Sequence, residues 1–244
     1  MFTSKSWFTV APLFLGIMLP QSGCKKASTT PKANARKANT PTTRSKPAPR
    51  KPVAKNVVLF FGDSLTAGYQ LAKSQAFPDR IGKAWKKEKR GWKTRGAGYS
   101  GGTTAGALSQ LDWNLTPDIH SVFLAIGAND GQRGKKIKDI QNNIEELIKR
   151  IQKKGIRVIL AGIMIPPNLG PKYTKAFKEI YPTVAKKYKL KLMPFLLKDV
   201  AGRRELNLAD GVHPNAKGHE IITNNILVFF KKEKLFASAP PAPR

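Results

Sequence analysis

Four short polar segments of the sequence combine the residue types that acyl transfer requires. They are Gly62-Asp63-Ser64-Leu65, Ser100-Gly101-Gly102-Thr103, Gly127-Ala128-Asn129-Asp130 and Asp210-Gly211-Val212-His213-Pro214. Ser64 is a candidate nucleophile, although a serine hydroxyl attacks only weakly until a base removes its proton. His213 is the candidate base, and Asp210 lies three residues before it, where a carboxylate can turn back to Nδ1 of the imidazole. The sequence therefore predicts a Ser-His-Asp triad.

The same segments offer hydrogen-bond donors for the negative oxygen of a tetrahedral intermediate. The candidate donors are the backbone N–H groups of Ser64 and Gly101 and the side-chain amide of Asn129. A glycine at position 101 suits a backbone that approaches a substrate closely. Asp130 is expected to hold its loop rather than to react.

The other histidines and the single cysteine are expected elsewhere. His120 precedes an apolar segment, which favours a loop position, and His219 falls inside the last predicted helix, which favours a surface or structural role. Cys24 is the only cysteine, so an intramolecular disulfide is excluded. The sequence holds no Cys/His cluster with zinc spacing, and we expect neither a metal nor a cofactor.

Strands and helices alternate after residue 56, and these elements must position the polar segments. The predicted strands are residues 57–61, 92–95, 121–126, 156–161 and 190–193, and the predicted helices are residues 77–85, 137–151, 173–188 and 214–230. Pro182 marks a point where one of these helices could break. The alternation predicts an α/β fold, a three-layer α/β/α domain with a mostly parallel five-stranded sheet. Ligands bind at the carboxyl ends of such strands, so the four polar segments should meet at one rim.

The four segments resemble the signature blocks of the SGNH (GDSL) hydrolase family over about residues 57–230. Residues 61–69, Phe-Gly-Asp-Ser-Leu-Thr-Ala-Gly-Tyr, look like its nucleophile block, and residues 210–214 look like its Asp-x-x-His block. The chain is most similar to the periplasmic thioesterase I, lysophospholipase and arylesterase type, through residues 67–69, 129–131 and 173–182.

The resemblance implies a flavodoxin-like SGNH fold and a role for each site residue. It implies Ser64 as nucleophile, with Asp210 and His213 completing the triad. Gly101, rather than its neighbour Gly102, matches the family's glycine donor, and Asn129 matches its asparagine donor. The stretch 163–171 would then border the acyl pocket.

The first 24 residues are typical of an export signal. Lys5 precedes an uncharged apolar stretch, residues 7–19, that is too short to span a membrane comfortably. The signal ends in a segment that resembles a bacterial lipobox, with Gln21 where that pattern prefers Leu. We therefore expect lipid attachment at Cys24 in the cell envelope or periplasm, with a plain secretory signal as the alternative. In enterobacterial lipoproteins an Asp directly after the cysteine favours retention in the inner membrane. Lys25 occupies that position here, which favours an outer membrane.

Positive charge continues along the chain. Lys plus Arg number 44 and Asp plus Glu 15, which gives a formal net charge of +29. Residues 25–55 contain basic residues and no acid, in a Pro-, Thr- and Ala-rich segment that predicts a flexible linker able to contact anionic lipid or wall polymer. Residues 56–234 are predicted as the hydrolase domain and residues 235–244 as a disordered tail.

Together these features predict an exported serine ester hydrolase that acts as a monomer. The expected substrates are acyl esters with an apolar acyl group, namely lysophospholipids, arylesters and acyl thioesters. One alternative is a deacetylase of envelope polysaccharide, because SGNH folds also perform that reaction. Another is a basic module that binds wall polymer or nucleic acid, although the charge is scattered and no basic-aromatic motif for specific nucleic-acid binding is present.

Overall fold

The computed structural model describes residues 53–241, which belong to one compact unit. The predicted signal segment, Cys24 and the linker up to residue 52 lie outside the described residues. No helix within residues 53–241 has the length and apolar character needed to cross a membrane.

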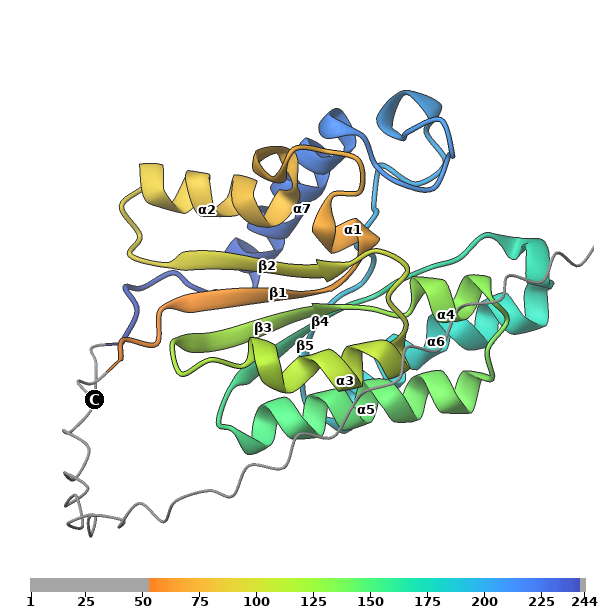
Figure 1. Ribbon diagram of the computed structural model, residues 1–244, viewed down its shortest axis with the longest axis horizontal. Helices are drawn as coiled ribbons and strands as arrows, with labels where there is room; N and C mark the ends of the chain where they lie inside the picture. Colours follow the sequence, from red (N-terminus) through yellow and green to blue (C-terminus); the bar gives the residue numbers. More distant parts are fainter. Residues whose placement is uncertain (1–52, 242–244) are drawn as a thin grey trace, which may run out of the picture. The chain divides into compact units, whose positions relative to one another are not determined.

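Five parallel strands form one sheet in the order β2-β1-β3-β4-β5 (Figure 1). The strands are β1 (Val57–Asp63), β2 (Lys93–Tyr99), β3 (Ile119–Ala125), β4 (Arg157–Ala161) and β5 (Lys191–Met193). All seven residues of β1 are buried, as its unbroken apolar run predicts for a central strand covered on both faces. The predicted five-stranded parallel sheet is confirmed.

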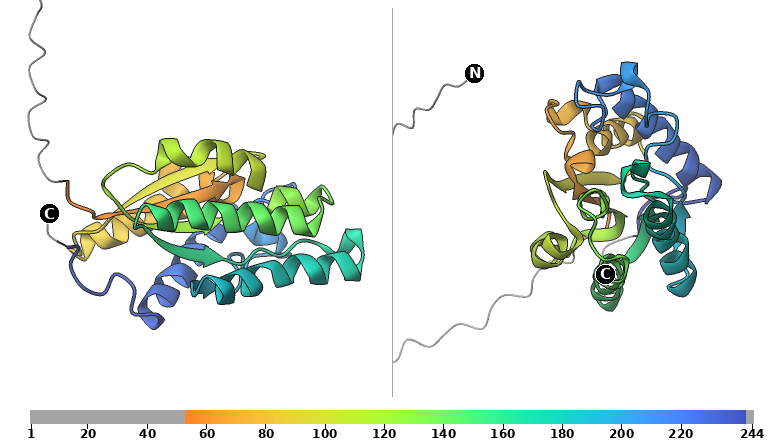
Figure 2. Two further views of the ribbon diagram at one scale, coloured as in Figure 1. Left: turned by 90° about the horizontal axis from the view of Figure 1, so that it is seen from below. Right: turned by 90° about the vertical axis from the view of Figure 1, so that its right-hand side faces the viewer.

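Helices cover both faces of the sheet, which confirms the three-layer prediction (Figures 1 and 2). One face carries α2 (Phe77–Lys87) and α7 (Ala216–Lys232), which contact each other. The other carries α3 (Thr104–Asn114), α5 (Ile137–Lys153) and α6 (Pro171–Lys187). The short elements are α1 (Ser64–Ala67), α4 (Ala128–Gln132) and the 3-10 helices η1 (Lys73–Gln75), η2 (Pro167–Leu169) and η3 (Arg204–Leu206).

Aromatic side chains fill the space between the sheet and the α2–α7 layer. The Phe60 ring centroid lies 5.6 Å from that of Phe77 and 5.2 Å from that of Phe123. Phe230 of α7 lies 5.9 Å from Trp85 of α2. Truncation of one such buried ring typically costs about 3–5 kcal/mol. This layer therefore holds α2 and α7 firmly against the strand that leads to Ser64.

Helix α3 is not among the predicted helices. Its apolar residues do not follow one face, since Ala107 and Leu111 are buried whereas Trp113 is 85% exposed. The helix begins at an N-cap, where Thr103 Oγ1 accepts the Gly106 N–H at 3.2 Å. Packing against the rest of the chain, rather than an amphipathic pattern, stabilises it.

Helix α6 runs through Pro182 without a break. A proline removes the N–H that would bond to the carbonyl four residues earlier. Pro182 lies on the exposed side of the helix, so that carbonyl is open to water and the helix continues.

His120 lies in β3, and the predicted loop position is wrong. The strand begins at buried Ile119, ahead of the polar His-Ser pair that conceals its start in the sequence. The His120 ring packs edge-on against Trp92, with centroids 4.7 Å apart, and its Nδ1 is 2.7 Å from Ser121 Oγ.

The chain stays packed beyond residue 234, where the sequence predicts the domain to end. Leu235 and Phe236 are buried, and the Phe236 ring lies 5.3 Å from Trp85 and 5.1 Å from Trp92. Trp92 Nε1 donates to the carbonyl of Ser238 at 2.8 Å. The predicted tail therefore begins with residues that close one end of the aromatic layer.

Candidate active site

Ser64 lies at the carboxyl edge of the sheet, where β1 turns directly into α1. Asp63 caps this short helix, and its Oδ1 accepts the Leu65 N–H at 3.0 Å. At this edge β1 and β3 approach each other closely. A Cβ added at Gly62 would lie 2.2 Å from the carbonyl oxygen of Ala125, so the close approach requires glycine at position 62. The helix ends at Gly68, which has a φ of +71° and donates its N–H to the Ser64 carbonyl. This tight strand-to-helix turn fixes the Ser64 backbone.

The structure brings together the three residues of the predicted triad. Ser64 Oγ lies 2.9 Å from His213 Nε2, and His213 Nδ1 lies 2.7 Å from Asp210 Oδ2. With its proton on Nδ1, the imidazole donates to Asp210 and presents Nε2 as the acceptor for the Ser64 hydroxyl. Side chains separated by 149 positions in the chain thus form one hydrogen-bonded chain.

The Asp210–His213 segment is a turn closed by its own carboxylate. Asp210 Oδ1 accepts the N–H groups of Val212 at 2.9 Å and His213 at 3.0 Å. Partial burial raises the pKa of Asp210, but these backbone N–H donors and the His213 side chain outweigh it and lower the pKa to about 2. The carboxylate is therefore ionised at neutral pH, as needed to hold the imidazole.

An aromatic ring supports the imidazole from a third direction. The Tyr69 ring centroid lies 4.4 Å from that of His213. Tyr69 follows α1, so the segment that carries the serine also carries the surface on which the histidine rests. Tyr69 is not among the predicted site residues, and its only signal in the sequence is its place in the Ala-Gly-Tyr segment at residues 67–69.

The turn at the predicted oxyanion hole contains two adjacent glycines, Gly101 and Gly102, and each position requires glycine for a different structural reason. Gly101 has a φ of +73°, and a Cβ there would meet only Arg133 Nη2, at 3.8 Å. A Cβ at Gly102 would lie 2.8 Å from the Tyr99 carbonyl oxygen, which also accepts the Gly102 N–H. The turn therefore needs glycine at 101 for its left-handed conformation and at 102 for close packing.

Asn129 joins this turn to the end of β3. Its Nδ2 donates to the carbonyl of Gly102 at 3.0 Å. An amide nitrogen carries two protons, so one remains for an oxyanion. The segments that contain Gly101 and Asn129 are thus held together, as the sequence predicts.

Asp130 holds its loop, which confirms the sequence interpretation. Its two carboxylate oxygens accept the N–H of Thr104 at 2.8 Å and the hydroxyl of Thr104 at 2.9 Å. Asn143 Nδ2 donates to the same Thr104 Oγ1 at 3.1 Å. This buried network ties the start of α3 to α4 and α5 next to Asn129.

Two further titratable groups are buried near the site. Asp63 is fully buried with no partner for Oδ2 among the described residues, and burial raises its pKa to about 7.

His219 is also buried. Its Nδ1 accepts the Phe77 N–H at 3.2 Å, and burial followed by the Arg80 charge lowers its pKa to about 4. His219 is therefore a neutral structural residue, as predicted.

Within residues 53–241, no group of three or more His, Cys, Asp or Glu side chains has an arrangement that could hold a metal ion.

Residues 60–221 match the GDSL-like Lipase/Acylhydrolase family. The chain belongs to this family. This GDSL hydrolase is 33% identical over 174 residues to the esterase TesA of Pseudomonas aeruginosa, which covers 71% of this chain and 87% of that protein. It is 29% identical over 172 residues to the thioesterase 1/protease 1/lysophospholipase L1 of Escherichia coli K12, covering 70% of this chain and 81% of that protein.

The fold of the hydrolase agrees with that of solved relatives. The psychrotrophic esterase EstA of Pseudoalteromonas, in a structure inhibited by monoethylphosphonate, superposes with a TM-score of 0.71 at 33% identity. The match covers 73% of this chain and 98% of that one. The names of these relatives agree with a carboxylic ester hydrolase, and they confirm both the predicted family and its thioesterase and lysophospholipase type.

Proposed function

We propose that this GDSL hydrolase cleaves acyl esters through an acyl-enzyme on Ser64. The observation that carries the proposal is the hydrogen-bonded chain from Ser64 Oγ through His213 to Asp210, with both contacts under 3 Å. A serine with a base at hydrogen-bond distance, and a base oriented by a carboxylate, is the arrangement that activates a hydroxyl nucleophile.

In the first half-reaction, Ser64 Oγ attacks the acyl carbonyl and its proton moves to His213 Nε2. The carbonyl oxygen becomes negative and accepts hydrogen bonds from the N–H groups of Ser64 and Gly101 and from the free amide proton of Asn129. The bond to the leaving oxygen or sulfur then breaks, and His213 gives that atom its proton. The negative charge of Asp210 stabilises the imidazolium between these transfers.

In the second half-reaction, water replaces the leaving group. His213 accepts a proton from the water as the water oxygen attacks the acyl carbon of the ester on Ser64. Collapse of the second tetrahedral intermediate breaks the acyl bond to Ser64 Oγ, and the proton returns from His213 to that oxygen. The products are the free acid and the starting enzyme.

The proposed substrates are esters with an apolar acyl group, including lysophospholipids, arylesters and thioesters. The names of the relatives support this choice, since they include an esterase and a thioesterase/lysophospholipase. The segment 163–171 reaches the first residue of α6 and exposes Met164 and Leu169, and we propose that it borders the acyl chain.

Labelling and a chain-length series test the reaction and the substrate separately. A fluorophosphonate should attach to the peptide that contains Ser64, and Ser64→Ala should abolish hydrolysis while leaving the unfolding curve unchanged. Attachment to another residue would overturn the mechanism. The full chain should cleave p-nitrophenyl butyrate and octanoate; activity confined to acetyl esters, including acetylated sugars, would instead indicate a deacetylase.

We also propose export to the cell envelope and lipid attachment at Cys24. The support is the sequence alone, an apolar signal followed by the single cysteine of the chain. Cells that produce the full chain and are fed labelled palmitate should incorporate label into the protein. Cys24→Ser should remove the label, and label that persists in this variant would contradict the assignment.

A further inference from the structure

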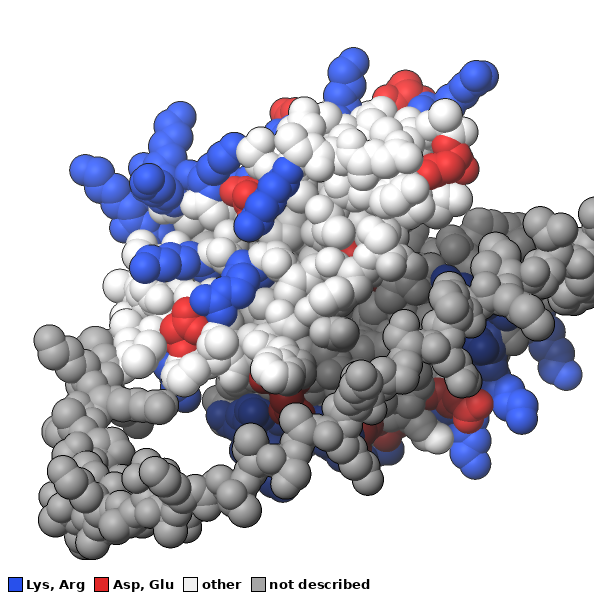
Figure 3. Space-filling model, in the orientation of Figure 1, with Lys and Arg blue, Asp and Glu red and all other residues white. Residues whose placement is uncertain are grey.

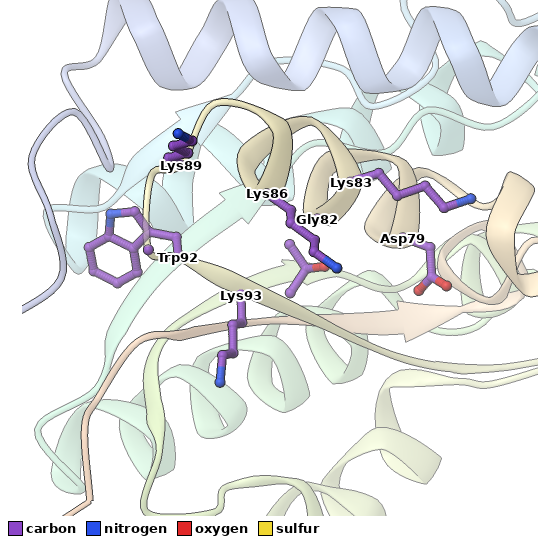
Figure 4. A pocket seen from close by; sticks show the side chains of 9 residues that line it. Asp79, Gly82, Lys83, Lys86, Lys89, Trp92 and Lys93 are labelled. Atoms are coloured by element: carbon purple, nitrogen blue, oxygen red, sulfur yellow. The ribbon is translucent and has the colours of Figure 1, made fainter.

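A groove lies between helix α2 and the first residues of β2, away from the triad (Figure 4). Its volume is about 750 Å³. Lysines line it from three parts of the chain: Lys83 and Lys86 from α2, Lys89 from the connecting loop and Lys93 from β2. Asp79, at one end, is its only acidic lining residue. Thr94 faces Gly82 of α2, so the neighbouring Lys93 side chain points away from α2 (Figure 4). The groove therefore concentrates positive charge along its α2 wall and the loop that follows it.

The lysines of the groove outnumber its acidic groups, since Asp79 is the one acidic residue that lines it. None of the four lysines forms a salt bridge with an acidic residue of the described chain. Lys83 Nζ donates to the carbonyl of Ser74 at 3.3 Å rather than to a carboxylate. In the space-filling view, blue side chains gather over α2 and the start of β2 (Figure 3). An anionic ligand would supply the missing counter-charge.

The backbone gives this groove a fixed floor. A Cβ at Gly82 would lie 2.3 Å from Thr94 Oγ1, so glycine lets α2 approach β2 closely between the lysines. Trp92, at the end of the groove, is buried and held by its hydrogen bond to the Ser238 carbonyl. The floor is therefore rigid, and the flexible lysine stems stand at its rims.

The groove is elongated along the edge of the sheet. β2 is an edge strand, so one side of its backbone pairs with no other strand of the described sheet. A smaller hollow of about 290 Å³ shares Asp79 as a lining residue and follows β2 to Gly96 and Gly98, where Thr66 and Ala67 of α1 also line it. A chain-like ligand matches this shape better than a compact ion.

The lysines also lie far from the catalytic edge. Lys93 pairs with Val57 at the start of the sheet, whereas Asp63 pairs with Tyr99 next to the nucleophile. Seven strand residues span about 20 Å. A ligand confined to the lysine groove, which no residue of α1 lines, would leave the triad free.

We propose that this groove is a second binding site, which takes a linear anion with repeated phosphate groups. Lysine ammonium groups bind phosphate oxygens as point charges without demanding one geometry, which suits successive phosphates of a flexible chain. The site would hold the enzyme on a phosphate polymer while the catalytic edge remains accessible.

Lysine footprinting on the full chain locates the site directly. Acetylation of each lysine is measured by mass spectrometry with and without inorganic polyphosphate. We expect at least fivefold protection of Lys83, Lys86 and Lys89. Equal protection of Lys138, Lys153 and Lys178, exposed lysines on the opposite face of the sheet, would overturn the proposal because it would show diffuse charge binding.

Matched variants test the energetics. Replacement of Lys83, Lys86 and Lys89 by Gln should weaken polyphosphate binding about tenfold and reduce the slope of log K against log salt by about two. The same replacement at Lys138, Lys153 and Lys178 should change the affinity less than about threefold, with the same basic linker present in both proteins. Equal losses in the two triple variants would refute a specific groove.

Asp79→Asn supplies a gain-of-binding test. Removal of the only acidic lining residue should tighten polyphosphate binding by about threefold. All of these variants should hydrolyse p-nitrophenyl butyrate at the parent rate, which shows that they are folded. Unchanged affinity in Asp79→Asn would contradict the assignment.

The form of the phosphate ligand is tested with two further probes. Orthophosphate should protect the three groove lysines far less than polyphosphate at equal phosphate concentration. Vesicles of phosphatidylglycerol should protect no more strongly than polyphosphate. Protection by vesicles alone would overturn the proposal in favour of a membrane contact.

Discussion

The ring of Tyr69 lies against the imidazole of His213, with centroids 4.4 Å apart and ring planes inclined by 38°. The two residues are distant in sequence, yet Tyr69 directly follows the helix that carries Ser64. The contact therefore couples the position of the base to the position of the nucleophile. It limits the tilt of the imidazole in the direction that the Asp210 hydrogen bond leaves free.

Tyr69→Ala should lower kcat about tenfold, because small displacements of a catalytic group are costly. KM should change little, and Tyr69→Phe should stay near the parent rate because the ring, not the hydroxyl, makes the contact. Steady-state kinetics on p-nitrophenyl butyrate checks this. Equal rates for the Ala and Phe variants would show that the ring contact does not position the base.

Asp210→Asn should reduce kcat by roughly 10²- to 10⁴-fold, since an amide favours the wrong imidazole tautomer. The Val212 and His213 N–H groups should keep their acceptor, because asparagine retains one carbonyl oxygen. The unfolding midpoint should therefore move little while activity is lost. A variant with parent activity would show that the carboxylate does not orient His213.

Asn129→Ala should lower kcat by about 10²- to 10³-fold through the loss of one oxyanion donor. It also removes the bond to the Gly102 carbonyl, which should cost about 1 kcal/mol of unfolding free energy. Kinetics and urea unfolding together separate the two effects. If stability falls and kcat does not, Asn129 is only a structural link between the segments.

Asp63 should make stability depend on pH. Burial raises its pKa in the folded protein to about 7, above the value of 3.8 for an exposed carboxyl. The folded state therefore binds the proton more tightly, so its contribution is greatest below pH 3.8, is lost as pH rises to about 7, and is constant above that.

Asp63→Asn replaces the protonated acid by a neutral group of similar shape and keeps an acceptor for the Leu65 N–H. The variant should gain stability relative to the parent, on the order of a few kcal/mol, as pH rises from about 4 to about 7. Urea unfolding at a series of pH values checks this. Parallel stability curves for the two proteins would contradict it.

The sequence was sufficient to predict the features that depend on local patterns. The buried strand at residues 57–61 and the amphipathic helix after residue 137 follow from period and composition. The Asp210–His213 spacing predicts a turn in which the carboxylate reaches the imidazole, and that turn is present. The order of strands then brings Ser64 and His213 to one rim.

Features that depend on partners across the fold were not predictable in this way. Helix α3 has no continuous apolar stripe in the sequence, and its start is held by the hydrogen bond from Thr104 N–H to Asp130, which lies in another segment of the chain. The Tyr69 contact with His213 requires the relative placement of two distant loops. The packing of Phe236 requires the site that Trp85 and Trp92 provide.

The direction of β1 has a consequence for how the enzyme meets its surroundings. The first described residue, Val53, comes just before the start of this strand, and Ser64 comes just after its end, about 20 Å further along. The chain therefore enters the domain at the end of the sheet opposite the reactive serine. A tether joined at this end would leave the catalytic edge unobstructed, so that substrates could reach Ser64 without passing the tether.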